Sequence, residues 1–501
     1  MLKKRLFGLL LLAAFIFSAT ALFAQAKPQD KKAQDKKGVE LVEPVKQEKP
    51  KGKEKLMIFN GEYLKAQLYG FVRFDMVYNT TDVRHESSPL LTENHNVYFN
   101  PLGTSLATQF ITAGTSSQKL FTIKKTAAQR GGSFVIDMRV TRLGLIVKGP
   151  KVLLADTMAQ VEFDFWGTMT RSGTGNRQGM IRMRHALGRF DWPSGTFLVI
   201  GQYWSVAMAM PAQPLTATFI PFGENGNLFM REPMIWLGQK IGNDKFNVTI
   251  EAAAARVQAG ADSGQPTDLF PGDNGVQLDD RGPGEASKYP GGRARITFVV
   301  NPNEIFNLTF GGTGHYQLER HAFNLASYTN NLIWGTAILT TNQQAFLAQK
   351  WSKLTKSYSA QAFGKVQVSL VTLLAAYWRG NNMDTFLNGG GQNGAVENFT
   401  STKILGIPMQ GGYAQVQIDL RKVAPIPLLF SAAYGGIKKS NKRNIALGNI
   451  QWNECILANV FWYLNDYIHV AFEYGRHQTQ WKGNLGPSVD HKYHTQVQFS
   501  F

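Results

Sequence analysis

Charged side chains recur two residues apart at several places in this chain of 501 residues. Arg73 and Asp75 form one such pair, and Arg182 and Arg184 form another. A guanidinium donates two parallel hydrogen bonds to a carboxylate or a phosphate, so these groups can pair with acids of the protein or with an anionic solute. The spacing therefore indicates either a wall of paired charges or a site that attracts anions.

The sequence gives little support to enzymatic chemistry. A hydrolase needs a nucleophile and a base held together, and the chain has no G-x-S-x-G motif. The glycine-rich stretch 311–314 precedes no helix signal, so it is not a phosphate loop. Loop 262–280 holds five aspartates without the spacing of a calcium loop. We expect no enzymatic activity, no metal and no cofactor.

Alternation of apolar and polar residues predicts the elements that carry these charges. In 160–165, Gln160, Glu162 and Asp164 share one face of a strand, and apolar residues share the other. In 133–148 the apolar positions are 134, 136, 138 and 140, then 143, 145 and 147. Val140 is thus expected on the outer face. The change of phase at Thr141-Arg142 predicts a bulge.

Similar runs continue from about residue 67 to the C-terminus and predict sixteen to eighteen strands. Short turns, such as 192–195, 242–244 and 301–303, alternate with long polar loops near 79–132, 205–228, 258–291 and 379–410. Tyr and Trp gather near strand ends, as at a membrane interface. We predict an all-β fold, a transmembrane antiparallel β-barrel of about 16 strands with long external loops and short periplasmic turns. The alternative is a periplasmic β-sandwich.

The N-terminal region predicts export. A basic start, the apolar stretch Leu6 to Phe17 and the small residues around Ala24 are typical of a cleaved signal peptide, which we place at 1–24. A Lys-rich periplasmic tether at 25–62 has almost nothing to bury, and the transmembrane β-barrel is expected at 63–501. Cys455, the single cysteine, rules out an intramolecular disulfide. The expected location is the bacterial outer membrane.

The last strand carries the outer-membrane assembly signal that we expect. Its residues alternate so that aromatic and apolar side chains share one face and end on the final residue of the sequence. These residues are Tyr493, Val497, Phe499 and Phe501. The pattern resembles the signal recognised by the outer-membrane barrel assembly machinery, which is therefore an expected partner.

Five strand motifs together resemble the DcaP-like family of trimeric outer-membrane porins, of the Gram-negative general porin type. The motifs are Tyr69–Asp75, Thr141–Gly144, Val161–Gly167, Arg182–Ala186 and Gly201–Ser205. The resemblance implies a sixteen-strand barrel, a homotrimer and diffusion of small anionic solutes. Some family members begin with a coiled coil, whereas Lys27–Lys55 has prolines and no heptads.

In general porins the loop after the fifth strand narrows the lumen, and here that loop is expected at Ser205 to Leu228, with Glu224 its only charge. A narrow passage of low dielectric focuses the field of charges on the facing wall. The expected pore-lining and constriction residues are Arg73, Asp75, Asp137, Arg139, Arg142, Glu162, Asp164, Arg182, Arg184 and Glu224. Arg231, Arg293 and Arg295 are further candidates near strand starts.

Because arginine is prominent among these side chains, we predict a passive porin for small hydrophilic solutes that prefers anions, carboxylates in particular. The same spacing equally indicates that the arginines pair with acids of the adjacent strand, as cross-strand partners often do. The alternative function is a closed-lumen receptor or adhesin that binds a partner through its long external loops. The formal charge of +18 suits anionic lipid or solute, and for an exported chain we expect no nucleic acid partner.

Overall fold

The computed structural model describes residues 56–501 except 62, 82, 85–90, 93–95, 100–120, 125–130, 168–178, 258–283, 285–286, 304, 324–350, 388–394, 399–402, 441–449 and 483–485. The expected signal peptide and most of the expected tether lie outside this part. Within it, no helix is long and apolar enough to cross a membrane.

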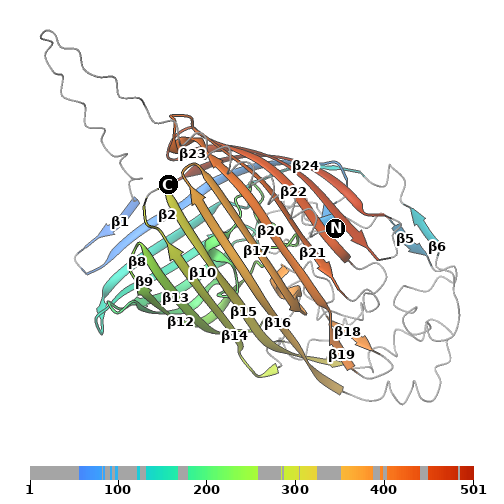
Figure 1. Cartoon of the computed structure of the whole chain (residues 1–501), viewed down its shortest axis with the longest axis horizontal. Coiled ribbons are helices and arrows are strands. Elements are labelled where there is room, and N and C mark those ends of the chain that lie inside the picture. Colours follow the sequence, from blue (N-terminus) through green and yellow to red (C-terminus); the bar gives the residue numbers. More distant parts are fainter. Residues whose placement is uncertain are drawn as a thin grey trace, which may run out of the picture. The chain divides into compact units, whose positions relative to one another are not determined.

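The described chain forms a closed antiparallel barrel of sixteen strands (Figure 1), as the sequence predicts. The first eight are β2 (Lys65–Asn79), β7 with β8 (Ser133–Asp137 and Arg142–Val152), β9 (Ala155–Asp164), β10 (Arg182–Asp191), β11 (Thr196–Trp204), β12 (Arg231–Gly242), β13 (Phe246–Ala255) and β14 (Gly291–Val300). The rest are β15 (Phe306–Phe323), β16 (Trp351–Val368), β17 (Val371–Asn381), β20 (Pro408–Asp419), β21 (Leu428–Lys439), β22 (Ile450–Tyr463), β23 (Ile468–Trp481) and β24 (Ser488–Ser500). β2 closes the barrel by pairing with β8 on one side and β24 on the other.

Shorter elements lie outside this ring. They are β1 (Leu56–Asn60), β3 (Val83–Arg84), β4 (Leu91–Thr92), β5 (Asn96–Phe99), β6 (Phe121–Lys124), β18 (Ala395–Asn398) and β19 (Lys403–Gly406). β1 pairs with the start of β2, so residues 56–60 of the expected tether are a strand. Three short 3₁₀ helices are η2 (Met210–Ala212), η4 (Asp384–Leu387) and η5 (Leu420–Lys422).

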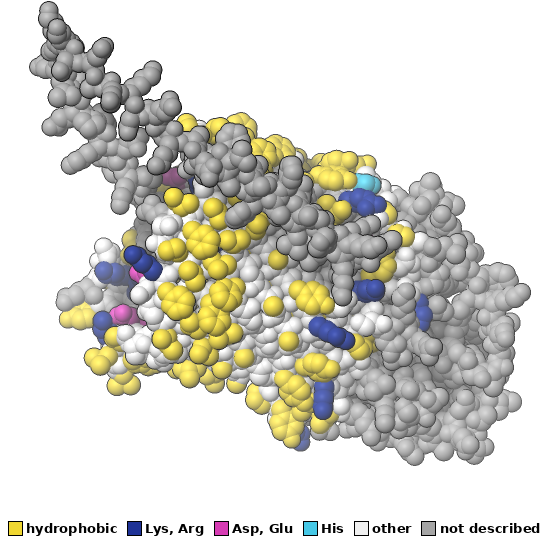
Figure 2. All heavy atoms as spheres, in the orientation of Figure 1, with side chains coloured by type: hydrophobic (Ala, Val, Ile, Leu, Met, Phe, Trp, Pro, Cys, Tyr) yellow, Lys and Arg dark blue, Asp and Glu magenta, His cyan; other side chains and the backbone are white. Residues whose placement is uncertain are grey.

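The two faces of the wall differ as the alternation predicts. On β7, Phe134 and Ile136 are 63% and 57% exposed, whereas Asp137 is buried. Figure 2 shows apolar side chains spread over the outer face of the barrel. In lipid every backbone polar group must find its partner within the protein, and a closed barrel with an apolar exterior meets that requirement. The polar faces of the strands therefore line the lumen.

The predicted change of phase near residue 141 is present as a break between β7 and β8. Residues 138–141 leave the strand in a turn in which the Thr141 amide donates to the Met138 carbonyl over 3.0 Å. The expectation that Val140 faces outward is wrong. The turn directs Val140 into the lumen, where it is 2% exposed and packs with Phe219, Ile220 and Trp481.

The two ends of the barrel are unlike. Seven connections of two to eight residues join strands at one end. Three of them, 192–195, 243–245 and 301–305, overlap the turns predicted at 192–195, 242–244 and 301–303. Most connections at the other end are longer, as in outer-membrane barrels, although the one between β23 and β24 has only six residues. At the short-turn end, the amide of Phe501 donates to Gly70, and the amide of Gly70 donates to Phe501.

Candidate functional site

The connection between β11 and β12, residues 205–230, folds into the lumen (hereafter the inner loop). Its backbone is bonded to inward side chains from strands around the barrel. The Met208 carbonyl accepts from Arg295 over 3.2 Å, the Ala207 carbonyl accepts from Thr313 over 2.8 Å, and the Ala212 carbonyl accepts from Tyr413 over 3.0 Å. The inner loop therefore crosses the interior, where sequence analysis expected the constriction.

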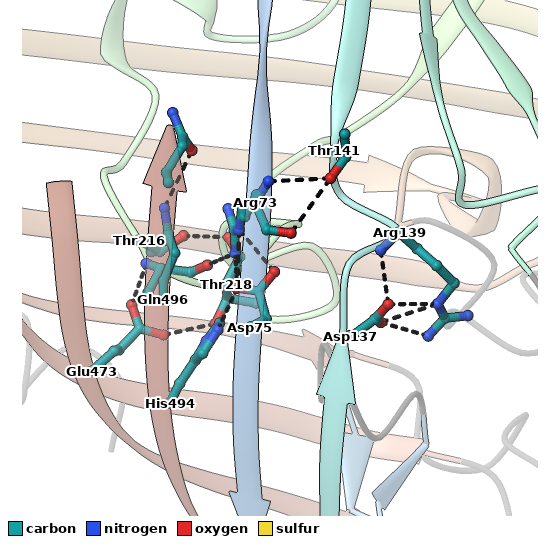
Figure 3. A network of polar contacts seen from close by, with 12 residues as sticks. Arg73, Asp75, Asp137, Arg139, Thr141, Thr216, Thr218, Glu473, His494 and Gln496 are labelled. Atoms are coloured by element: carbon teal, nitrogen blue, oxygen red, sulfur yellow. Dashed lines mark hydrogen bonds and ion pairs between the residues drawn. The ribbon is translucent and has the colours of Figure 1, made fainter. Parts of the chain in front are cut away.

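One stretch of the inner loop is held to the wall formed by β23, β24 and β2 (Figure 3). The Glu473 carboxylate accepts from the Ala217 amide over 2.8 Å and from the Thr218 hydroxyl over 2.7 Å. Glu473 also forms an ion pair of 2.6 Å with Lys492, and both side chains are fully buried. Arg73 donates to the Ala217 carbonyl. We call Arg73, Asp75, Glu473, Lys492 and His494 the anchoring side.

On the anchoring side, Arg73 and Lys492 each have a carboxylate as partner, and His494 shares the partner of Arg73. Arg73 contacts both carboxylate oxygens of Asp75, with Nε at 2.9 Å from each. His494 Nε2 lies 2.7 Å from the same carboxylate. Removing one member of a buried pair leaves an uncompensated charge, which is strongly destabilising. These groups are therefore suited to holding the inner loop in position.

The opposite part of the inner loop packs on a wall of β17, β20 and β21 (the apolar side). Trp378 Nε1 donates to the Gly226 carbonyl over 2.7 Å. Gly226 has a φ of +113°, and a Cβ at this position would collide with the backbone of Gly412. Glycine is needed here because other residues rarely adopt this conformation and because the two backbones approach closely.

A second segment, which includes η4, joins this packing. Phe386 and Leu387 are fully buried beside Trp378 and Leu228 of the inner loop. The Phe229 amide donates to the Phe386 carbonyl over 2.9 Å. The apolar side of the lumen is thus filled by two inward segments that pack on each other and on the wall.

Charged groups gather on β8, β9, β10 and the start of β12. Arg142 and Arg182 each lie opposite Asp164 on a neighbouring strand. Arg182 contacts both oxygens of Asp164 at 2.9 and 2.6 Å, and Arg184 bridges Glu162 at 2.5 Å and Asp164 at 2.8 Å. Glu162 and Asp164 are both buried. The pairing of arginines with acids of the adjacent strand is therefore present.

This cluster contains more cations than acids. We define the arginine cluster as Arg142, Arg182, Arg184 and Arg231 with Glu162 and Asp164. Among the described residues it thus holds four guanidinium groups and two carboxylates. The Nε of Arg142 has no hydrogen-bond partner within the described part of the chain. A field of net positive sign in a low-dielectric interior attracts anions.

Aromatic rings of the wall and of the inner loop cover these guanidinium groups. The ring of Phe219 lies within 5.9 Å of the Cζ atoms of Arg142, Arg182 and Arg184. The ring of Trp204 lies 5.6 Å from Arg184 and 5.2 Å from Arg231. Cation–π contact stabilises a guanidinium without neutralising its charge, so the inner loop supports the cluster and leaves its charge in place.

Of the further arginine candidates, Arg231 belongs to this cluster, whereas Arg293 and Arg295 do not. Arg293 is bound by Glu232 at 2.9 and 2.8 Å, and Arg295 by Glu251 at 2.5 and 2.7 Å. Both cations face inward, as predicted. Because each has its own carboxylate, they add little net charge to the lumen.

The remaining predicted residues are distributed as follows. Asp137 binds Arg139 beside the break in the strand, with 2.7 Å between their closest atoms, and Arg139 lies over Trp166 at 4.2 Å. Glu224 is buried, but its backbone carbonyl accepts from Asn453 on β22, which places it against another wall from the arginine cluster. The aspartate loop 262–280 lies entirely outside the described residues.

The residues of the expected assembly signal share one face of β24. Tyr493, Phe499 and Phe501 are 53%, 48% and 38% exposed, and Val497 is partly exposed on the same face. Their recognition by assembly machinery stays a prediction.

Sequence analysis missed Glu473 and Lys492, which hold the inner loop. The signal was available, because both residues occupy inward positions of neighbouring strands by the same alternation that located Glu162 and Arg184. Trp378 and Gly412 gave no comparable signal, since an apolar residue and a glycine in a strand are ordinary. Their role depends on where the inner loop lies.

No protein-family model matches the chain, and no curated protein matches it. Among solved structures, the outer-membrane channel DcaP of Acinetobacter baumannii is similar over 88% of this chain and 99% of its own, with 16% identity and a TM-score of 0.57. An anion-selective porin from Comamonas acidovorans covers 87% of this chain and 100% of its own, with 9% identity and a TM-score of 0.48. For Salmonella typhi OmpF the values are 89% and 100%, 12% and 0.46. The predicted resemblance to DcaP is confirmed for the fold, and the chain has the fold of a bacterial outer-membrane channel.

Proposed function

We propose that this protein is a porin of the bacterial outer membrane, through which small hydrophilic solutes diffuse passively and anions, carboxylates in particular, pass preferentially. The proposal includes no catalytic step. It assigns residues 1–24 to a signal peptide, 25–62 to a periplasmic tether, and the rest to the barrel in lipid. By the resemblance of its strand motifs to those of trimeric porins we include a homotrimer.

The observation that carries the proposal is the unequal charge of the arginine cluster. Four guanidinium groups and two carboxylates of the described residues lie on one side of the lumen, where the inner loop contributes the ring of Phe219. Because the apolar side is packed with side chains, we assign the route for a solute to the arginine side. Arg182 is 30% exposed there. The positive field lowers the free energy of an anion in such a passage and raises the free energy of a cation.

The test is single-channel conductance of the purified full chain in a planar bilayer, with the reversal potential measured under a salt gradient. We expect stepwise conductance and a reversal potential that favours anions. The double variant Arg142→Gln, Arg231→Gln lowers the anion-to-cation permeability ratio about threefold, because it removes two charges from a focused field. A reversal potential that favours cations in the wild type would refute the anion preference.

A second candidate is a receptor or adhesin barrel with a closed lumen. The observation in its favour is the apolar packing between the inner loop and η4 inside the barrel. The same experiment separates the two functions. A folded barrel that never conducts, under conditions in which a known porin does, would support the receptor and exclude the channel.

A further inference from the structure

The first and last strands of the barrel meet at a seam between β2 and β24, and β24 covers only part of the edge that β2 offers there. Its last residue, Phe501, lies opposite Gly70, and the amide of each donates to the carbonyl of the other over 3.1 and 3.2 Å. The edge of β2 nearer the short-turn end is occupied by β1, which begins with Leu56 opposite Leu68 (Figure 1). β1 therefore continues the line of β24 along the edge of β2.

The alternation of side chains does not by itself fix the register of this seam. In the structure Val72 lies opposite Phe499. A shift of β24 by two residues toward the short-turn end would place Val497 opposite Val72, and every side chain would keep its face, because the period of a strand is two. The inward pair of Asp75 and His494 would not oppose this shift, because the shift would bring these two residues directly opposite each other.

β1 blocks this shifted register. The shift would place Phe501 opposite Leu68, which is the position that Leu56 occupies. Two residues along a strand span about 6.6 Å, so β24 finds no free edge of β2 to move along. A shift in the opposite direction is opposed at the long-loop end, where the buried carboxylate of Asp490 on β24 accepts from two backbone amides just after β2, over 2.8 and 3.0 Å.

The register of the seam also decides how the inner loop is held. Ala217 of this loop is bound from both sides of the seam, because its amide donates to Glu473 on β23 and its carbonyl accepts from Arg73 on β2. Figure 3 shows these two charged side chains on their strands. β23 pairs with β24 along most of its length, so a two-residue shift of β24 would carry Glu473 about 6.6 Å along the barrel relative to Arg73. The two bonds to Ala217 could not then both form.

We propose that β1 is a register stop. It occupies the short-turn end of the edge of β2, so that β24 closes the barrel only in the register that aligns the two sides of the Ala217 anchor. Residues 56–60, which the sequence alone assigns to a tether, thus take part in defining the interior of the barrel. Because this role concerns how the barrel closes, it is independent of whether the barrel conducts.

Engineered cysteine pairs measure the register directly, in a parent chain that carries Cys455→Ser. Val72→Cys with Phe499→Cys reports the native register, and Val72→Cys with Val497→Cys reports the shifted one. In the native register the second pair is diagonal, about 7–8 Å apart, whereas a disulfide needs about 4.4–6.8 Å between Cα atoms. Either disulfide closes most of the chain into a ring, which changes its mobility in a non-reducing denaturing gel.

Replacement of residues 56–60 by Gly-Ser-Gly-Ser-Gly removes the stop. We expect the shifted-register disulfide to rise about tenfold over the parent with β1 intact, because a register that keeps the apolar face outward becomes accessible. The matched control replaces residues 51–55, just before β1, by the same five residues and should stay at the level of the parent. Met57→Pro is a milder variant for the case that the full replacement does not fold. Proline cannot donate to a strand ladder, so we expect a smaller rise.

Two results would overturn the proposal. One is a folded β1 variant in which the shifted-register disulfide is no more frequent than in the parent, which would mean that the register is fixed elsewhere along the seam. The other is a parent in which the shifted-register disulfide forms as readily as the native one, which would mean that nothing stops β24 at this end. Heat-dependent mobility in a denaturing gel checks that each barrel is folded.

Discussion

The anchoring side and the arginine cluster use the same residue types and differ in how the charges are matched. On the anchoring side, Lys492 has Glu473 and Arg73 has Asp75, and this wall holds the inner loop by its backbone at Ala217. In the arginine cluster, the described residues supply two carboxylates for four guanidinium groups. Matched pairs therefore position the polypeptide, whereas the excess of one sign is the basis of the anion preference that we propose.

The largest expected effect comes from breaking the anchoring side with Glu473→Gln. The substitution leaves the buried ammonium of Lys492 without its counter-charge and weakens two bonds to the inner loop. We expect the free energy of unfolding to fall by about 3–5 kcal/mol, measured by urea titration in detergent with tryptophan fluorescence. Single-channel records should show larger and noisier steps, because the inner loop is released.

The double variant Glu473→Leu, Lys492→Met is the control for that result. It removes both charges together, and a buried pair replaced by apolar groups of similar volume is often close to neutral. We expect it to regain part of the lost stability. A double variant less stable than Glu473→Gln would show that the pair is not the source of the loss.

The next-largest effect is expected from a substitution in the arginine cluster. Asp164→Asn removes an acid that binds both Arg182 and Arg184, so the arginine cluster becomes more positive. We expect the reversal potential to shift further toward anions, at a loss of about 2 kcal/mol of stability. The shift should shrink between 0.1 and 1 M salt, where the Debye length falls from about 10 to about 3 Å. A shift toward cations would contradict the assignment.

A smaller effect is expected on the apolar side. Trp378→Phe keeps the ring but removes the donor to the Gly226 carbonyl, at a cost of about 1–2 kcal/mol for a buried acceptor left unbonded. Urea titration measures the loss. The reversal potential should stay as in the wild type, and a change as large as that of the arginine variants would mean that this wall also sets selectivity.

The smallest effect is expected for Arg421→Gln at the short-turn end. Arg421 is 38% exposed and contacts Asp419 over 2.8 Å. An exposed pair of this kind contributes less than about 1 kcal/mol, so stability, conductance and selectivity should all remain near wild-type values. This variant sets the baseline against which the other arginine substitutions are compared.

Alternation predicted the features of this molecule that depend on neighbouring residues of one strand. It located the inward charges at Glu162, Asp164 and Arg184, and the change of phase near Thr141. It was wrong for Val140, because residues 138–141 form a turn that no pattern of period two can describe. Contacts between distant segments, such as Trp378 with Gly226, depend on the path of the inner loop, and a strand pattern contains no information on that path.

The inner loop has a mechanical consequence for the barrel. It is bonded to Arg295, Tyr413 and Glu473, which stand on strands far apart around the circumference, so it acts as a strut across the cross-section. A tube braced in this way resists flattening when lateral pressure in the membrane rises. Flattening of the barrel would also displace the inner loop, because its bonds join strands that lie far apart around the circumference.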